Sequence, residues 1–191
     1  DGMAALAGDE SGATLAWTRD LDGDMLTTLD SMIAVSDWNV DAHTFDSPTL
    51  LSASDGGVTI SSTDNRAEHT LLATGMNFDV SLDRKYDALL DRSNTVLAFT
   101  LDRDGDVNTG GDRRIQLFRR NFDAVKLDPQ PLPPKTWSLL DPQPLPPRVE
   151  SPSVALDPTN LNNLKLAFLQ RDATDNQEGV AMLGGEATLW S

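Results

Sequence analysis

The strongest constraint on the fold of this chain is a segment that recurs along it. Residues 15–33 read LAWTRDLDGDMLTTLDSMI and residues 97–115 read LAFTLDRDGDVNTGGDRRI, and the two agree without a gap at ten of nineteen positions. A third copy, LAFLQRDATDNQEGVAML at residues 166–183, keeps the Leu-Ala-Phe start and loses the regular aspartate spacing. Internal repeats fold as repeated supersecondary units, so the chain is expected to stack copies of one motif.

The surroundings of the three copies predict the motif. Short apolar segments with a turn precede the copies, at residues 3–12, 86–94 and 153–160, and alternating segments follow them, at residues 33–38, 115–118 and 186–190. Period-two alternation bounded by Asn, Asp and Gly is typical of antiparallel strands. Each unit is therefore predicted to be a strand, a tight turn, a strand, an acidic loop and a strand, with no amphipathic helix.

The charge balance excludes one class of partner. Thirty acidic residues stand against fifteen basic ones, which gives a net charge of −15, and nucleic acid is not expected to bind because phosphate needs a basic face. Aspartate supplies 25 of the acids and glutamate 5, and aspartate prefers turns and metal-binding loops. No apolar run reaches the roughly 20 residues of a membrane helix, so no membrane span is expected. Cysteine is absent, which excludes disulfides and a thiol nucleophile.

The repeated acidic loops are the candidate metal sites. Carboxylates recur at relative positions 1, 3, 5 and 11, in Asp20, Asp22, Asp24 and Asp30 and again in Asp102, Asp104, Asp106 and Asp112. Several hard oxygens on one curled loop suit Ca²⁺, whereas carboxylates crowded without a cation repel one another. An EF-hand has glycine at position 6 and glutamate at position 12, and this loop has neither, so no helix–loop–helix is expected. The open alternative is a solvated acidic hairpin tip.

The order of these features resembles the repeats of bacterial secreted β-propeller proteins, in which a strand ending in Trp or Phe runs into D-x-D-G-D and a later Ser-Pro pair. The matching Ser-Pro pairs are Ser47-Pro48 and Ser151-Pro152, and the regions of Trp38 and Trp137 match the preceding outer strands. The resemblance implies an all-β fold, a partial or assembling β-propeller of antiparallel three- to four-stranded repeats, with calcium in the D-x-D-G-D loops.

The resemblance also divides the chain. The segments are residues 1–50 as propeller repeat 1, 51–82 as an insertion or degraded blade, 83–126 as repeat 2, 127–150 as a Pro-rich connection and 151–191 as an incomplete repeat 3. Three units are fewer than the four to eight blades of a typical propeller. The chain is therefore expected to belong to a longer protein or to assemble with other copies of itself.

Three further features have a plain interpretation and an alternative. The sequence LDPQPLPP occurs twice, at residues 127–134 and 140–147, and its prolines favour a stiff polyproline II connection over a peptide-domain ligand. Residues 55–60 are similar to a sialidase Asp box, although a Gly-Gly hairpin turn explains them as well. Trp17, Phe99 and Phe168 share one repeat position and are expected to pack between units rather than to bind a ligand.

Together these features predict a non-catalytic extracellular or cell-surface module for structural assembly, adhesion or binding. Its expected partners are other copies or the remaining blades of the same protein, with a glycan or a cell-surface protein left open. No nucleophile, base and orienting residue can be assembled from the sequence, and His43 and His69 both fall in polar loops. The alternative is a carbohydrate-binding or sialidase-like carbohydrate-active propeller.

Overall fold

The structure is a computed structural model, and it describes residues 3–20, 31–51, 58–61, 76–89, 92–102, 113–121, 136–140, 148–171 and 178–186. Within these ranges all regular structure is β-strand and there is no helix, which confirms the predicted all-β class. It follows that no helix in the described part of the chain could cross a bilayer.

The strands differ in length, from two residues in β4 to twelve in β7 and β12. In chain order they are β1 (Ala4–Asp9), β2 (Gly12–Asp20), β3 (Ser31–Asn39), β4 (Thr44–Phe45), β5 (Thr49–Leu51), β6 (Val58–Ser61), β7 (Met76–Asp87), β8 (Arg92–Asp102), β9 (Arg114–Asn121), β10 (Thr136–Leu140), β11 (Val149–Asp157), β12 (Asn160–Arg171) and β13 (Glu178–Glu186).

The strands form two antiparallel sheets. The larger sheet has the order β1-β2-β3-β5-β6-β10-β9-β8-β7, with β4 paired to β3 off this path, and the smaller one has the order β11-β12-β13. The larger order is symmetric about β6, with a four-stranded meander on each side. We call β1-β2-β3-β5 unit 1, β7-β8-β9-β10 unit 2 and β11-β12-β13 unit 3. The described strands form no closed ring of units.

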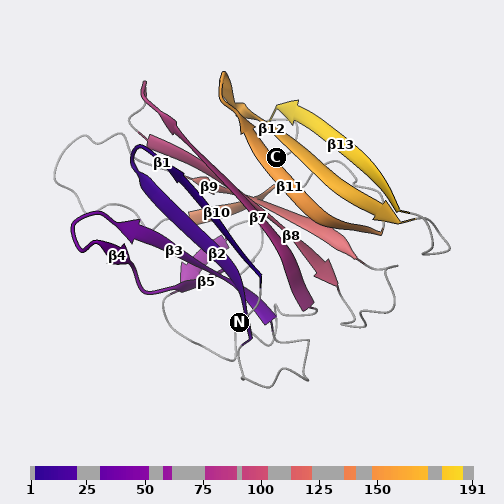
Figure 1. The fold of residues 1–191 in the computed structure, drawn as a ribbon, viewed down its shortest axis with the longest axis horizontal. Coiled ribbons are helices and arrows are strands. Elements are labelled where there is room, and N and C mark those ends of the chain that lie inside the picture. The colour runs from indigo at the N-terminus through magenta and orange to yellow at the C-terminus, as the bar shows by residue number, and fades with distance from the viewer. Residues whose placement is uncertain are drawn as a thin grey trace.

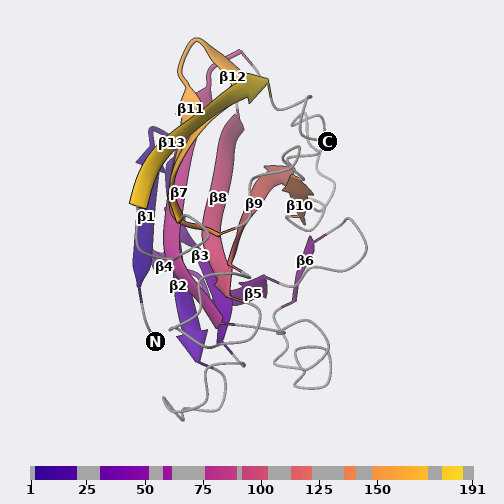
Figure 2. The same ribbon diagram turned by 90° about the vertical axis from the view of Figure 1, so that its right-hand side faces the viewer.

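The three units lie side by side, with unit 2 between the other two (Figure 1). The first strand of each later unit packs on the unit before it, because β7 contacts β1, β2 and β3, and β11 contacts β7, β8 and β9. Figure 2 shows the same arrangement turned by 90°, with β13 on the side of the viewer, in front of β7. Each unit therefore repeats its neighbour's way of packing as well as its fold.

Two apolar clusters fill the interfaces between the units. The cluster between units 1 and 2 contains Ala16, Ile33, Val35, Leu51, Leu97, Phe99, Phe118 and Trp137. The cluster between units 2 and 3 contains Val96, Ala98, Ile115, Leu117, Leu140, Val149, Val154, Leu156, Leu164, Leu166 and Phe168. Successive side chains of a strand point to opposite faces. Adjacent residues such as Val96 and Leu97 therefore enter different clusters.

The burial of the central strands follows from this stacking. Residues 93–100 of β8 are all buried, because unit 2 is covered on both faces. In β2 only alternate residues are buried, at Thr14, Ala16 and Thr18, and in β12 the buried residues also alternate, at Leu164, Leu166 and Phe168. Only in unit 2 do both faces of this central strand pack against a neighbouring unit.

A repeated bulge links sequence position to fold. One extra residue is inserted in β7 between Phe78 and Ser81, and one in β11 between Glu150 and Ser153. Each bulge lies across from the aromatic repeat position, Phe99 in one case and Phe168 in the other, and each contains a residue with positive φ, Asp79 at 52° and Ser151 at 51°. A bulge bends and twists a strand, so it shapes the first strand of these two units in the same way.

The turn between the first two strands is also repeated. An aspartate opens it in each unit, and its Oδ1 accepts a hydrogen bond from the N–H two residues later. The pairs are Ser11 N to Asp9 at 2.9 Å, Leu89 N to Asp87 at 3.0 Å and Thr159 N to Asp157 at 2.8 Å. An aspartate side chain in this position mimics a backbone turn, which explains why each hairpin begins with this residue.

The strand boundaries differ from the expected ones at β7. The expected strand at residues 86–90 is only the end of β7, which begins at Met76 and so crosses the expected boundary between residues 82 and 83. Of the expected strand at residues 186–190, only Glu186, the last residue of β13, lies within the described residues. The register explains the difference at β7, because the long β8 pairs with β7 back to Met76.

Candidate functional site at the interfaces between units

The predicted calcium loops begin at the ends of two central strands. Asp20 is the last residue of β2 and Asp102 is the last residue of β8. Figure 1 shows β2, β8 and β12 running in the same direction, so these three strands end on the same side of the stack. The other predicted ligands lie outside the described residues. These are Asp22, Asp24, Asp30, Asp104, Asp106 and Asp112.

Asp102 lies in a buried ion-pair cluster between units 2 and 3. Its Oδ2 accepts a hydrogen bond from Nε of Arg113 at 3.3 Å, and Nη1 of Arg113 also contacts Oε2 of Glu150. The exposed fractions are 0% for Asp102, 7% for Arg113 and 4% for Glu150. Burial by itself lowers the pKa of Arg113, but the hydrogen bonds and charges of Glu150 and Asp102 outweigh it and raise that pKa. This cluster therefore joins β8 to the start of β11.

The first of the two loops differs at the position of this arginine. Arg113 is the twelfth residue counted from Asp102, and the twelfth residue counted from Asp20 is Ser31. The cation that balances Asp102 therefore has no counterpart at the matching position of unit 1. Among the described residues no group of three or more acidic or histidine side chains is arranged to hold a metal. Because most of the predicted ligands lie outside those residues, calcium binding stays a prediction.

A second polar cluster lies between units 1 and 2, around Arg84 of β7. Nη1 of Arg84 donates to Oγ1 of Thr14 at 3.0 Å, and Nη2 donates to Oγ of Ser11 at 2.8 Å. The Nε atom lies 3.2 Å from Oδ1 of Asp9. Oγ of Ser11 also lies within hydrogen-bond distance of Oγ of Ser93, its equivalent in unit 2. One guanidinium thus connects β7 with both strands of the first hairpin.

Arg120 of β9 extends this cluster to β3. Its Nη1 donates to Oδ1 of Asp37 at 2.6 Å, and its Nη2 contacts Oδ2 of the same carboxylate. The guanidinium carbon lies 5.5 Å from the centroid of the Trp137 ring, which is a cation–π distance. Asp37 also accepts a hydrogen bond from Oγ1 of Thr14 at 2.9 Å. Two arginines of unit 2 are therefore matched by two aspartates of unit 1, Asp9 and Asp37.

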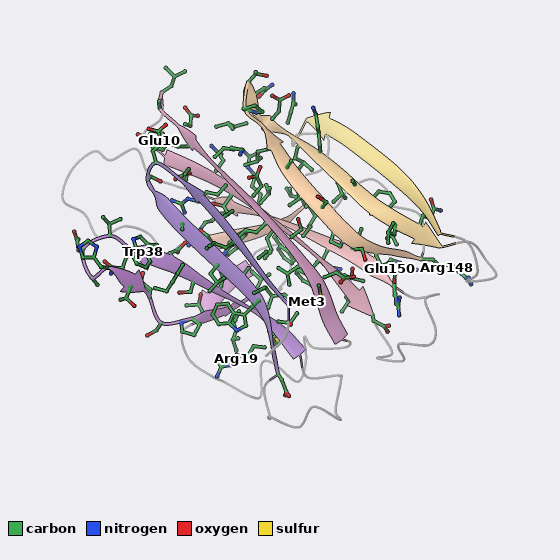
Figure 3. All side chains as sticks on the ribbon, in the orientation of Figure 1. Met3, Glu10, Arg19, Trp38, Arg148 and Glu150 are labelled. Atoms are coloured by element: carbon green, nitrogen blue, oxygen red, sulfur yellow. The ribbon has the colours of Figure 1, made fainter. Side chains whose placement is uncertain are left out.

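The two clusters lie at opposite ends of the strands. Figure 3 labels Glu10 and Trp38, the neighbours of Asp9 and Asp37 in sequence, at one end of the molecule, and Glu150 with Arg148 at the other. Each interface between units thus has arginine–carboxylate contacts at one end and apolar side chains along its length. Neither Arg84 nor Arg120 was expected from the sequence to lie at an interface, because contacts between stacked units leave no local spacing pattern.

The pairing of Asp9 leads to a pH prediction. Burial raises the pKa of Asp9, but hydrogen bonds from Ser93 and Ser11 and the charge of Arg84 outweigh burial, so its pKa lies below the ordinary value. A folded pKa below the unfolded one adds stability that is complete above the unfolded value, about 3.9, and is lost as the pH falls through the folded value. Asp9→Asn should therefore lose less stability than the native chain between about pH 5 and pH 3. Thermal unfolding at a series of pH values measures this.

The control for that experiment is Asp41→Asn, because Asp41 is exposed in the turn after β3. It should follow the native pH profile. If Asp9→Asn also followed that profile, the ionised Asp9 would contribute nothing to the interface between units 1 and 2.

Units 2 and 3 are also joined by a ladder of side chains from β7. Alternate residues of β7 accept hydrogen bonds from the edge of β11, with Val154 N donating to Oγ of Ser81 at 3.0 Å and Leu156 N donating to Oδ2 of Asp83 at 2.7 Å. Ser151 Oγ donates to Oδ2 of Asp79 at 2.9 Å, so the two bulges contact each other. Ser81 and Asp83 thereby satisfy donors of β11 that β12 does not.

The remaining sequence candidates have structural positions or lie outside the described residues. Phe99 and Phe168 are buried as expected, at 6% and 3% exposure, whereas Trp17 is only partly buried. His43 is exposed in a turn, and the strand β6 begins within the Asp-box-like segment. His69 and both LDPQPLPP copies, apart from Leu140, lie outside the described residues.

Comparison with known proteins adds no family to this description, because no protein-family model, no curated protein and no solved structure matches the chain. The class that the coordinates themselves define is an all-β chain of antiparallel meanders stacked face to face, with arginine–carboxylate clusters between them.

Proposed function

We propose that the chain is a non-catalytic structural module of the β-propeller-repeat type, with calcium bound in its D-x-D-G-D loops, that serves extracellular assembly, adhesion or binding. The observation that carries the proposal is that fold and packing repeat together. The aspartate turn recurs in all three units, and the bulge across from the aromatic position recurs in units 2 and 3. Repeat units of this kind bury their faces only against neighbours, so stacking is their means of stability.

The buried charges support a structural role. Arg84, Arg113 and Arg120 each contact a carboxylate of a neighbouring unit. A sialidase-like pocket needs arginines that face a ligand, and these three are at most 8% exposed. Their position favours stiffening of the stack over recognition of a sugar acid.

The aspartate loops support the calcium part of the proposal. Two segments of identical aspartate spacing follow β2 and β8, which run in the same direction. The second segment begins at a buried cluster in which one arginine contacts two carboxylates. A nearby divalent cation would balance the excess negative charge there. Carboxylate ligands held by a hard cation would also tie the second and third strands of a unit together.

Chelation tests the calcium part. The native chain should unfold at a lower temperature in EDTA, and excess calcium should restore the melting temperature, with a shift of roughly 5–10 °C if calcium is present at about 100 times its dissociation constant. Replacing Asp22 and Asp24 together with asparagine should remove part of the shift. Asp41→Asn, an exposed aspartate outside the loops, should leave it unchanged. If neither EDTA nor added calcium changed the melting temperature, calcium binding in the loops would be ruled out.

A further inference from the structure

The first two strands of unit 1 expose part of a face whose equivalents in units 2 and 3 are buried. On the neighbouring strands of the same face, Met32, Ala34 and Leu50 form a buried cluster against which Trp17 packs. The registers make Leu6, Leu82 and Val154 equivalent, because each pairs with the first leucine of the repeated segment. Leu6 is 64% exposed, Leu82 packs against unit 1, and Val154 is 6% exposed. The same face therefore passes from exposed to buried according to whether a preceding unit covers it.

The central strands show the same progression. Leu15 is partly buried in unit 1, whereas its equivalents Leu97 and Leu166 are both 0% exposed. Trp17 is likewise only partly buried, in contrast to Phe99 and Phe168. We call Leu6, Leu15 and Trp17 the head face. In units 2 and 3 the residues of this face dock on the preceding unit.

Unit 3 has the complementary face open. Ala167 occupies the repeat position of Ala16 and Ala98, which are both 0% exposed under the next unit, and Ala167 itself is only partly buried. Ser153 and Ala155 of β11 are exposed on the same face. We call Ser153, Ala155 and Ala167 the tail face.

The tail face also carries a polar contact of the existing interface. Ser153 pairs with Ala167, as Ser81 pairs with Ala98, so Ser153 is the equivalent of Ser81. Oγ of Ser81 accepts a hydrogen bond from the N–H of Val154, and the equivalent of Val154 on the head face is Leu6. Ser153 is therefore placed to accept the N–H of Leu6 from another copy.

Among the described side chains of this face, Lys165 is charged and exposed, and it lies near Asp157. Lys165 occupies the repeat position of Thr14 and Val96, which are both 0% exposed under the next unit. Docking in the same geometry therefore requires its aliphatic stem to lie in the interface and its ammonium to reach the rim. A lysine there is compatible with docking, provided that the ammonium stays hydrated.

From these equivalences we propose that the head face of one copy docks on the tail face of a second copy, in the geometry by which unit 3 docks on unit 2. The inference rests on the proposed stacking function and names its partner. Head-to-tail contacts use two different patches, so they generate a ring or an open stack rather than a symmetric dimer.

Two single-face variants of the full chain test this. Leu6→Glu places a charge on the head face and Ala155→Arg places one on the tail face, both at exposed side chains where the fold is not disturbed. The native chain should show a mass above 20.7 kDa that rises with concentration in analytical ultracentrifugation. Each variant alone should remain monomeric to at least about tenfold higher concentration.

The mixture of the two variants is decisive. Leu6→Glu keeps its tail face and Ala155→Arg keeps its head face, so an equal mixture should form a species of twice the monomer mass and nothing larger. A native chain that stays monomeric, or a mixture that does not pair, overturns the proposal. If Ala155→Arg alone formed dimers, the head face would pair with itself and the proposal would be wrong.

The matched control is Leu89→Glu, because Leu89 is 96% exposed in the turn between β7 and β8 and lies on neither face. It should assemble as the native chain does. Circular dichroism of each variant shows that the fold is kept. The chelation experiment on the isolated chain is read from the melting temperature of dilute protein, so its result separates failure of the calcium module from failure of head-to-tail docking.

Discussion

Replacing Arg113 with alanine should destabilise the folded chain by about 3–5 kcal/mol, because it leaves two carboxylates in the interface without their cation. Asp102 is fully buried and Glu150 nearly so, and Arg113 contacts both. Breaking one partner of a buried ion pair costs far more than the pair itself contributes, since the remaining charge has lost its water and its partner. Urea unfolding of native and variant chains measures the difference.

Two controls separate this cause from the loss of an arginine as such. Arg19→Ala removes a partly buried arginine from the end of β2 and should cost less than about 1 kcal/mol. Adding Asp102→Asn and Glu150→Gln to Arg113→Ala should recover a large part of the lost stability. If the triple variant were no more stable than Arg113→Ala, packing rather than uncompensated charge would explain the loss.

The pH dependence of Arg113→Ala gives an independent reading. Without the guanidinium, burial and mutual repulsion disfavour the charged forms of the two carboxylates in the folded variant. A folded pKa above the unfolded value favours folding as the pH falls through it. The free energy of unfolding of the variant should therefore approach that of the native chain as the pH falls from about 7 to about 4.5.

The second large effect is a difference between equivalent leucines. Leu97→Ala should cost about 2–5 kcal/mol, because Leu97 is 0% exposed between units 1 and 2 and its removal leaves a cavity. Leu15→Ala, at the same repeat position in unit 1, should cost at most about half as much, because Leu15 is only partly buried. Both values come from urea unfolding of dilute protein, below the concentration of any assembly.

The same pair of variants also reports on the head face. If the native chain assembles as proposed, Leu15→Ala should weaken the assembly more than it weakens the fold, and Leu97→Ala should do the reverse. Equal destabilisation of the dilute chain by both variants would mean that Leu15 is already covered within one copy, and the head face would not be open.

The repeated unit could be predicted from the sequence because its signals are local. Alternation of apolar and polar residues, and the turns at Asp9 and Asp157, depend on neighbours within a few residues. The all-β class and the strand–turn–strand–loop–strand order follow from them. The turn of unit 2 was expected at residues 91–94 and instead begins at Asp87. The start of β7 was misplaced because residues 76–85 pair with the far half of β8, and that pairing depends on the long hairpin rather than on a local turn.

The candidate site was less predictable. The sequence identified Asp102 through the spacing of its loop, but the other two members of its buried cluster, Arg113 and Glu150, lie 11 and 48 residues further along the chain. Arg113 stood out only as a departure from the calcium-loop pattern. Arg84 and Arg120 had no motif at all, because an ion pair between stacked sheets leaves no spacing in the sequence.

By itself, the sequence determined that this chain is made of copies of one antiparallel unit, since strand periodicity and turn chemistry are set by adjacent residues. Only the tertiary structure decided which face of each copy is buried. Leu6, Leu82 and Val154 occupy the same position in their units, and they differ in exposure because burial depends on the neighbour stacked above. Burial of an apolar side chain depends on the neighbouring unit in the stack, whereas formation of a strand depends on the sequence of the segment itself.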